Sequence, residues 1–569
     1  MTTQAGRGLR LVVLIAVMGA LVLPIIAGLW ETLAAAFGHL PAIGAVGPSV
    51  DPWRRLAGLP GIWTSLGLTL FTGLPSTVLA LMLAFGLCAA QPRWLTGGRI
   101  ARLLAPLLAA PHAAMAIGLA FLIAPSGWLA RMVSPWVSGW QLPPDLATVH
   151  DPLGLALTLG LVIKELPFFL LVILAALSQL PVKDHLNAGR ALGYGKGQVW
   201  AKLIAPQVYP LIRLPIFVVL AFALSVVDMA VILGPSNPPT LSVAVTRWFF
   251  SPDTSLLLPA SAGAILQAAL VGVAIAIWWL AEGPARWLGL WWVRLGQRGV
   301  AGGPGARAMA GLALGLMTLG ALALLGMLVW SFAWRWSFPQ FLPESWSLAA
   351  WMRPGAGWGH AAMNSLWLGL ATTVLSMGLA IAWLEGEDRA GLSRAGWAEA
   401  LIYLPLLVPQ VAFLYGLNVV FLRAGLTGGA SAVIWAQVLF VFPYVMIALS
   451  DPWRALDPRP VRIAASLGAG PLRRLVAVKL PMLLRPLLTA AAIGFAVSMA
   501  QYLPTLFMGA GRVATLTTEA VTLSSGSDRR VVGIYAVLQS AMPLAVYAAA
   551  LILPLVLYRH RRGMLGGAR

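Results

Sequence analysis

The sequence predicts an all-α, polytopic membrane protein. Of its 569 residues, 60% are hydrophobic and only 10% are charged, against roughly 45–50% and about 25% in an ordinary soluble domain. Uncharged runs such as Met309 to Trp330 reach the length of about 20 residues that a membrane-spanning helix requires. They lack the alternating segments of about ten residues that are typical of a membrane β-barrel. The composition therefore excludes a water-soluble enzyme.

Long apolar runs predict twelve membrane spans. They lie at 8–30, 64–90, 102–124, 155–177, 213–234, 259–280, 309–331, 363–385, 398–422, 432–449, 486–508 and 533–558. With a cytoplasmic N-terminus, most of the 38 Lys and Arg residues fall on the cytoplasmic side, so the positive-inside rule places both termini there. The first run, Leu11 to Trp30, is longer than the core of a signal peptide, and we expect it to be retained.

The remaining compositional features predict neither a cofactor nor a nucleic-acid partner. The formal charge is +20, but the basic residues lie between apolar runs rather than together on one soluble face. The six histidines lack the spacing of metal ligands, and no P-loop motif is present. The single cysteine, Cys88, cannot form an internal disulfide. We therefore expect no metal site and no nucleotide site on this chain.

One loop motif occurs twice, after the fourth and the tenth predicted span. The first copy, NAGRALGYGKGQVWAKLIAP, runs from Asn187 to Pro206, and the second, RIAASLGAGPLRRLVAVKLP, runs from Arg462 to Pro481. In each copy a small residue stands four positions before the glycine of a Leu-Gly pair, and a proline stands 13 positions after that glycine. The copies are 275 residues apart, close to half the chain, which predicts two tandem six-span repeats.

The repeats are placed at 1–284 and 309–569, with a linker at 285–308. Flanking segments support this division, because PTLSVAV from Pro239 corresponds to ATLTTEAV from Ala514. The linker contains several glycines, a composition typical of loops. Each repeat has an even number of spans, so both repeated loops lie on the same side of the membrane, predicted to be the cytoplasm.

The repeated residues predict a short helix that lies along the membrane surface. A small residue, Gly189 or Ala464, leaves room on one helix face for the backbone of another protein. The glycine of the Leu-Gly pair takes positive φ and ends the helix, and the closing proline suits the first turn of the helix that returns to the membrane. These glycines are Gly193 and Gly468, and the prolines are Pro206 and Pro481.

The two loops resemble the EAA loops of permease subunits in bacterial ATP-binding-cassette (ABC) importers of the binding-protein-dependent type. This resemblance implies a type I permease fold of two six-helix repeats, with coupling loops at about 181–210 and 452–485. It implies two copies of a cytoplasmic ATPase and a periplasmic substrate-binding protein as partners, and no enzymatic activity on this chain. The sequence is most similar to the group of the Ynj-type, ferric-iron and thiamine permeases, which implies thiamine or another small cation as substrate.

The loops depart from the EAA pattern at its first two positions. Asn187 and Arg462 stand where the pattern has an acidic residue, and Ile463 replaces the first alanine, which Ala188 retains. An acidic contact to the ATPase therefore does not carry over, and we expect a docking groove matched to Asn and Arg. The alternative for these loops is a pair of basic turns held to anionic lipid, but lipid attraction does not require the repeated glycine-to-proline interval.

Three ionisable side chains lie within the predicted spans, where a charge is either paired or functional. Lys164 and Glu165 precede Pro167, and we expect them to hold helices together. With a shift of two residues, Asp228 matches Gln501 of the second repeat. These two side chains either line the substrate pathway, where a carboxylate favours a cation such as thiamine, or form a polar pair between the repeats.

Two other classes of protein compete with the permease. A proton-coupled secondary transporter can also have twelve spans in two parallel repeats, with Glu165 and Asp228 carrying protons, but it has no need of duplicated docking loops. The segment 91–102 also lacks the charge signature of the largest carrier superfamily. A membrane enzyme requires a nucleophile, metal cluster or carboxylate pair near one surface, and none recurs. We therefore predict a multi-pass permease of the bacterial inner membrane.

Overall fold

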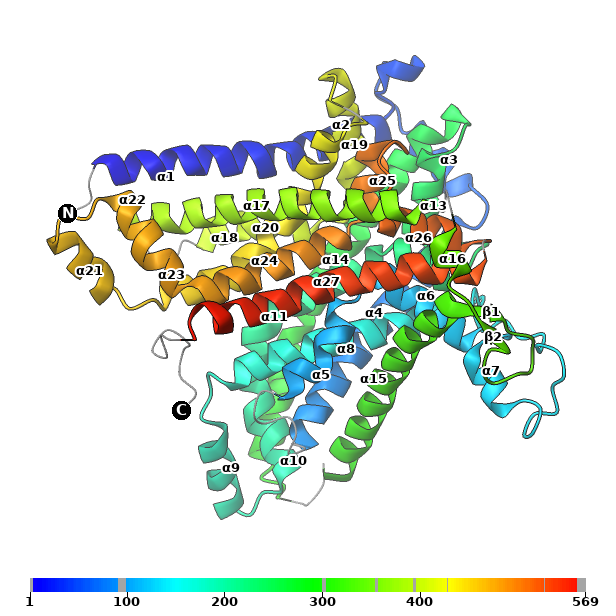
Figure 1. The fold of residues 1–569 in the computed structure, drawn as a ribbon, viewed down its shortest axis with the longest axis horizontal. Coiled ribbons are helices and arrows are strands. Elements are labelled where there is room, and N and C mark those ends of the chain that lie inside the picture. The colour runs from blue at the N-terminus through cyan, green and yellow to red at the C-terminus, as the bar shows by residue number, and fades with distance from the viewer. Residues whose placement is uncertain are drawn as a thin grey trace.

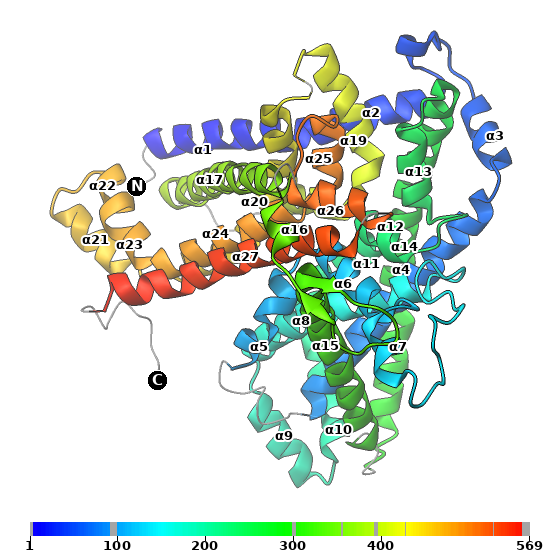
Figure 2. The same ribbon diagram turned by 45° about the vertical axis from the view of Figure 1, so that its right-hand side comes forward.

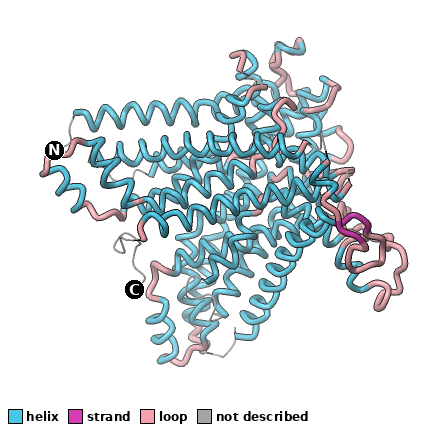
Figure 3. Tube along the Cα trace, in the orientation of Figure 1, coloured by secondary structure: helices cyan, strands magenta, loops and turns pink. Residues whose placement is uncertain are grey.

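The structure is a computed structural model. It describes residues 4–90, 99–298, 303–353, 357–391, 396–426, 428–526 and 528–559. Helices dominate the described residues, and a single two-stranded hairpin is the exception among them (Figure 3). Ten helices in this part of the chain are long and apolar enough to cross a membrane, and two further bent helix pairs bring the total to as many as twelve. The upper number agrees with the predicted twelve spans.

The described residues of the first repeat form eighteen short and long helical segments, of which η1 and η4 are π-helical. They are α1 (Gln4–Val17), η1 (Met18–Val22), α2 (Leu23–Ala36), η2 (Pro41–Ile43), α3 (Asp51–Gly58), α4 (Ile62–Ala90), α5 (Arg99–Ala109), α6 (His112–Ile123), α7 (Trp128–Val133), α8 (Leu155–Leu177), α9 (Val182–Ala191), α10 (Lys196–Val199), η4 (Trp200–Ile204), α11 (Ala205–Ser225), α12 (Asp228–Leu233), α13 (Leu241–Phe249), η5 (Thr254–Leu256) and α14 (Leu257–Arg294).

The second repeat adds a β-hairpin and a third π-helical turn, η6. Its elements are α15 (Gly303–Phe332), β1 (Ala333–Arg335), β2 (Ser345–Trp346), α16 (Ala349–Met352), α17 (Trp358–Ala390), α18 (Gly396–Leu407), α19 (Gln410–Arg423), α20 (Ala430–Arg454), α21 (Arg459–Ser466), α22 (Pro471–Arg474), η6 (Leu475–Lys479), α23 (Leu480–Met482), α24 (Leu484–Met499), α25 (Leu503–Gly509), α26 (Leu516–Ser524) and α27 (Arg529–Leu557). The strands pair antiparallel, with Ala333 opposite Trp346.

The helices form two bundles that diverge from a common body (Figures 1 and 2). One bundle contains α4, α5, α8, α11 and α15 and ends at α9 and α10. The other contains α17, α20, α24 and α27 and ends at α21 and α22. In both views α9 and α21 lie at the far ends of their bundles, whereas the β-hairpin and α7 lie where the bundles meet.

The first helix of each repeat packs on the opposite repeat. Helices α1 and α2 contact α17 and α19, and α15 contacts α4 and α6. The crossing of α2 and α19 is close enough that a Cβ at Gly416 would lie 2.0 Å from the Gly28 carbonyl oxygen. The crossing of α6 and α15 is similarly close, since a Cβ at Gly118 would lie 2.5 Å from the Ala323 carbonyl oxygen. Small residues thus let backbones approach where the repeats exchange helices.

At the end opposite α9 and α21, Arg131 joins the two repeats. Its guanidinium donates to the carbonyl oxygens of Ser337 (2.7 Å) and Gln340 (2.9 Å) in the loop between β1 and β2. Trp128, on the same helix α7, donates its indole N–H to the Phe341 carbonyl oxygen at 3.1 Å. These bonds satisfy loop carbonyls that no strand pairs, and they fix the repeats to each other at this end.

The fifth span and the linker differ from their predicted positions. The fifth helix begins at Lys196, well before the predicted span at 213–234, and ends at Ser225, so Asp228 begins the separate helix α12. The apolar run continues across this break, which is why hydropathy does not detect it. Helix α14 continues beyond 284 to Arg294, and residues 299–302 of the predicted linker lie outside the described residues.

Candidate functional site

Both repeated loops fold into the same helix-turn-helix unit. We name α9 to α10 (182–199) the first elbow and α21 to α22 (459–474) the second elbow. In the first elbow, the Tyr194 N–H donates to the Gly189 carbonyl and the Gly193 N–H to the Arg190 carbonyl, each at 2.9 Å. These are the two bonds of the Schellman motif, in which the residue after the helix is left-handed. Gly193 has φ +79°, as predicted.

The second elbow repeats these bonds at the same spacing. The Ala469 N–H donates to the Ala464 carbonyl at 2.9 Å and the Gly468 N–H to the Ala465 carbonyl at 3.1 Å. Gly468 has φ +81°, a conformation that costs a side chain roughly 1–2 kcal/mol and that glycine adopts freely. The repeated Leu-Gly pair is therefore a helix stop in both elbows.

In the first elbow, the small residue before the helix stop does not have the predicted role. Gly189 is buried, and a Cβ there would lie 2.3 Å from Cγ2 of Val199 in the same elbow. The absence of a side chain at Gly189 thus allows α9 to pack on α10, rather than leaving room for another protein. In the second elbow, Ala464 is partly exposed.

The returning helix begins in the same way in both repeats. Gly195 and Gly470 have extended φ and ψ and precede α10 and α22. One π-helical turn follows, η4 or η6, and their first residues are 275 positions apart. Pro206 and Pro481 then lie in the first turns of α11 and α23, as predicted.

The outward face of each elbow combines exposed apolar and polar side chains. Leu192 is 61% exposed and Leu467 is 81% exposed, and the second elbow also exposes Ile463. Asn187 and Arg462, which replace the acidic residue of the EAA pattern, are exposed as well. Clustered exposed apolar side chains are typical of a protein–protein contact. The remaining predicted elbow residue, Ala188, is also exposed.

A second group of polar residues lies deep in the molecule. Lys164 on α8 is buried, and its ammonium donates to the carbonyl oxygens of Leu107 (2.9 Å), Leu108 (3.2 Å) and Ala110 (2.6 Å). These carbonyls are free because Pro111, which has no N–H, interrupts the third span between α5 and α6. These bonds join α8 to the end of α5, which agrees with a packing role for Lys164.

Glu165 and Asp228 both interact with His112, the first residue of α6. The His112 ring contacts the Glu165 carboxylate at 3.3 Å (Nε2 to Oε1). Buried Asp228 interacts electrostatically with His112 and Lys164, and Tyr502 of the second repeat interacts with Asp228. The group formed by these side chains therefore spans the boundary between the repeats.

The second repeat contributes two amides, of which Gln501 directly precedes Tyr502 in the chain. Gln410, the first residue of α19, follows Pro409 as His112 follows Pro111. Its amide lies 3.5 Å from the Gln501 amide oxygen. We name His112, Glu165, Asp228, Gln410, Gln501 and Tyr502 the central polar group.

The predicted equivalence of Asp228 and Gln501 is wrong. Helix α12 begins at Asp228 and α25 begins at Leu503, which preserves the 275-residue offset of the elbows. Asp228 therefore corresponds to Leu503, and Gln501 corresponds to Val226. The two polar side chains reach the central polar group from different positions, because each lies at or beside the break that follows α11 or α24.

Sequence reasoning missed a polar pattern shared by α4 and α17. Thr77 donates its hydroxyl to the Gly73 carbonyl at 2.9 Å, and Thr373 donates to the Gly369 carbonyl at 2.6 Å. These pairs are 296 residues apart, as are the starts of the two helices. A search for Gly-x-x-(Ser/Thr)-Thr in the sequence would have found both copies.

Close to α17, neutral side chains form a buried network in the second repeat. The Gln437 amide accepts from the Ser498 hydroxyl at 2.6 Å and donates to the Thr505 hydroxyl at 3.0 Å. A small cavity beside this network is lined by Gln501 and Thr517, among others. Its polar lining is uncharged, and Gln501 connects it to the central polar group.

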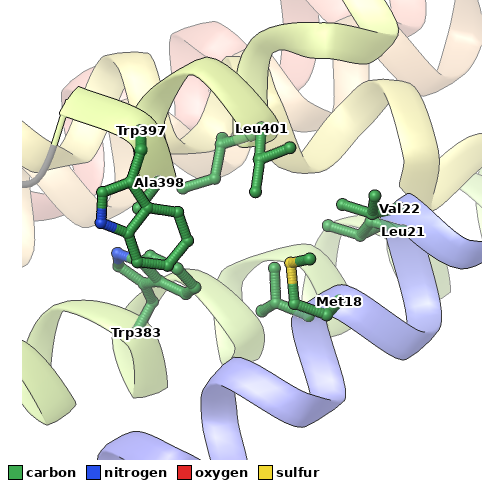
Figure 4. A pocket seen from close by; sticks show the side chains of 9 residues that line it. Met18, Leu21, Val22, Trp383, Trp397, Ala398 and Leu401 are labelled. Carbon is green, nitrogen blue, oxygen red and sulfur yellow. The ribbon is translucent and has the colours of Figure 1, made fainter.

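Another cleft, between α1 and η1 on one side and α17 and α18 on the other, is apolar (Figure 4). Met18, Trp383, Trp397 and Leu401 line it, and none of its lining residues is charged. Because it offers no charged group for a polar substrate, we do not place the functional site there.

Comparison with known proteins identifies the family. No family model matches the chain. Over 529 residues it is 32% identical to the inner membrane ABC transporter permease protein YnjC of Escherichia coli (strain K12), and this match covers 91% of the chain and 94% of YnjC. The chain belongs to the ABC transporter permease family. It is a fused ABC importer permease, because one chain carries both repeats.

A shorter match agrees with the fused arrangement of this ABC permease. The molybdenum transport system permease protein ModB of Azotobacter vinelandii is 29% identical over 174 residues, which are 28% of this chain and 76% of ModB. Most of a ModB chain is thus matched by little more than a quarter of this chain. Membership of this family argues against the secondary-transporter and enzyme alternatives. It also supports a multi-pass location in the inner membrane.

Proposed function

We propose that this ABC permease couples substrate passage to ATP hydrolysis on separate subunits through its two elbows. The observation that carries the proposal is the same Schellman stop at the end of both bundles, at a constant spacing along the chain. A rigid, surface-exposed elbow on each bundle suits a docking contact with one copy of an ATPase. The exposed leucines, Leu192 and Leu467, would enter the groove of each ATPase.

The proposed orientation places both elbows and both termini in the cytoplasm. The basic residues of the elbows, including Arg190, Lys196, Arg462 and Arg473, support this side of the bilayer. The opposite end, which Arg131 holds together, would then face the periplasm and receive a substrate-binding protein. We propose two repeats that meet between the end of α14 at Arg294 and the start of α15 at Gly303, which is narrower than the predicted linker at 285–308.

The central polar group is the proposed lining of the translocation pathway. It takes side chains from both repeats, most of them at helix breaks, and two of them, Glu165 within α8 and Asp228 at the start of α12, are carboxyl groups. Acidic groups at this depth favour a small cation, of which thiamine is our first candidate. The second candidate is an oxyanion, because ModB is named for molybdenum transport. Uptake of labelled thiamine and of molybdate into vesicles that contain the assembled transporter separates these candidates.

Valine substitutions at the two helix stops test the coupling role. Gly193→Val and Gly468→Val each force a β-branched residue into positive φ, which costs roughly 1–2 kcal/mol and distorts the elbow. We expect a lower rate of ATP hydrolysis stimulated by substrate, with normal membrane insertion, in the transporter purified with its ATPase. Gly311→Val is the matched control, because space around Gly311 in α15 is open. Normal coupling in both elbow variants would refute the proposal.

A further inference from the structure

A buried cluster of charged side chains lies at the base of the second elbow. Lys479, in η6 directly after the elbow, donates from its ammonium to Glu385 at 2.6 Å and to Asp388 at 2.5 Å. The Lys479 side chain is 9% exposed and that of Glu385 is 6% exposed. Both carboxylates belong to the last turns of α17. The second elbow is thus fastened to α17 by ion pairs.

The same acidic turn also holds α20 and α1. Glu387 forms ion pairs with Arg454, at the end of α20 (3.1 Å), and with Arg10 of α1 (3.8 Å). The Arg10 guanidinium lies 3.9 Å from the centre of the Trp383 ring, a cation–π contact. We name Arg10, Glu385, Glu387, Asp388, Arg454 and Lys479 the charge cluster. It connects the second elbow to the first helix of the chain.

In the part of the chain that the structure describes, the first elbow shows no counterpart of this cluster. Helix α17 is offset from α4 by 296 residues, and the second elbow is offset from the first by 275. At these offsets, uncharged residues stand at the positions equivalent to Glu385, Glu387, Asp388, Arg454 and Lys479. They are Ala89, Gln91, Pro92, Gln179 and Ile204.

Lys202 lies in η4 at the base of the first elbow. Its described contacts are with a backbone carbonyl and an aromatic ring rather than with carboxylates. Its ammonium donates to the Gln297 carbonyl oxygen at 3.1 Å and lies 4.7 Å from the centre of the Trp292 ring. Both partners belong to the C-terminal end of α14 and the segment after it. Among the described residues, therefore, different kinds of contact hold the bases of the two elbows.

Burial of these ion pairs resists their separation more than it raises the stability of the protein. A buried ion pair often adds little stability over apolar side chains of the same size, but removing one partner leaves an uncompensated charge. Turning the second elbow away from α17 would separate Lys479 from Glu385, whose side chains are both shielded from water, whereas Asp388 is 43% exposed and adds less to this barrier. Among the described residues, the base of the first elbow shows no such ion pair, and α10 instead packs against α4 and α15.

We propose that the charge cluster is the joint through which the second elbow moves α17 and α1 as one body. Lys479 is a positioning residue in this proposal, and the two elbows contribute unequally to coupling. This inference rests on the proposed function, since it assumes that the elbows receive motion from the ATPase. Because α1 leads into α2, which packs on α19, movement of the second elbow would reach the helix crossing between the repeats.

The test compares Lys479→Met with Lys202→Met in the full transporter, reconstituted with its ATPase in lipid nanodiscs. Cys88 is first changed to Ser, and spin labels are placed at Ser466→Cys on the second elbow and Ile15→Cys on α1, both exposed. Double electron–electron resonance then gives the distance between labels with and without ATP and vanadate. Substrate-stimulated ATP hydrolysis is measured on the same samples, and Lys479→Arg is the conservative variant.

We expect one narrow distance between the labels in both nucleotide states of the parent protein, because the joined elements move together. Lys479→Met should make this distance depend on nucleotide and should lower the stimulated rate about tenfold, within the usual range of a coupling effect. Lys479→Arg should restore both, and Lys202→Met should leave the distance unchanged. An unchanged distance and rate in Lys479→Met, or equal losses in the two methionine variants, would overturn the proposal.

If Lys479→Met fails to insert, a charge swap replaces it. Glu385→Lys alone should uncouple the transporter, and Glu385→Lys combined with Lys479→Glu should regain part of the stimulated rate. Absence of recovery in the inserted double variant would overturn the proposal. The elbow variants separate the two levels of inference. Normal rates in both Gly193→Val and Gly468→Val contradict the coupling function itself, whereas uncoupling in Gly468→Val with a normal rate in Lys479→Met contradicts only the joint.

Discussion

Lys164 illustrates how a charge at membrane depth is accommodated without a direct ion pair. Its ammonium binds three carbonyl oxygens at the end of α5, so one side chain satisfies several groups that a broken helix leaves free. The sequence predicts a structural role for this residue, but it does not identify the groups that the ammonium binds. The actual carbonyls come from the neighbouring break at Pro111, because contacts between helices are not encoded in local spacing.

Lys164→Met should destabilise the protein. The substitution keeps the apolar stem and removes the donor, so buried carbonyls lose their partner at a cost of about 1–3 kcal/mol. We expect a lower melting temperature in detergent. Arg335→Met is the control, because that side chain is 77% exposed and its loss should change the melting temperature little. Equal melting temperatures of Lys164→Met and the parent protein would contradict the structural role.

Asp228→Asn should weaken transport if the central polar group lines the pathway. The change preserves shape and hydrogen bonding and removes the charge that interacts with His112 and Lys164. We expect slower uptake of thiamine by vesicles with an unaltered amount of inserted transporter. Gln437→Glu offers a contrast, since it adds a charge to the neutral network nearby. Unchanged uptake kinetics of Asp228→Asn would leave Asp228 as a structural group between the repeats.

At the scale of elements, the sequence predicts helices well and their interruptions poorly. The span at 155–177 coincides with α8, and the positive φ of Gly193 and Gly468 follows from the Leu-Gly repeat. Breaks within an apolar run leave hydropathy unchanged, so the separation of α12 from α11 escapes prediction. The pairing of His112 with Glu165 is equally invisible, because it depends on how α6 packs on α8.

Helix exchange between the repeats gives a prediction at the same scale. Gly28→Val should prevent the close crossing of α2 and α19, because a Cβ at Gly28 would lie 2.4 Å from the Phe413 carbonyl oxygen. Overpacking of this kind costs typically about 1–3 kcal/mol. We expect less inserted protein and a lower melting temperature. Gly19→Val lies on the same membrane segment with open space around it and should behave like the parent protein; equal losses in both variants would argue against the crossing.

At the scale of the whole molecule, two bundles are joined at one end and carry an elbow at the other (Figure 1). Arg131 fixes the joined end, and the first helices of the repeats cross between the bundles. Forces applied at the elbows would therefore change the separation of the bundles around the central polar group. The two repeats share this plan but differ in charge, since only the second has the ionic joint among the described residues.

The most direct test of the elbows as ATPase docking sites is cysteine cross-linking in the assembled transporter. On a Cys88→Ser background, Leu192→Cys and Leu467→Cys place one thiol on each elbow, and Trp136→Cys places one at the opposite end, where Trp136 is 90% exposed. We predict that a short bifunctional reagent links the ATPase to both elbow positions and not to Trp136→Cys. Cross-links to the ATPase only from the opposite end, or from neither elbow, would contradict the coupling role of the elbows.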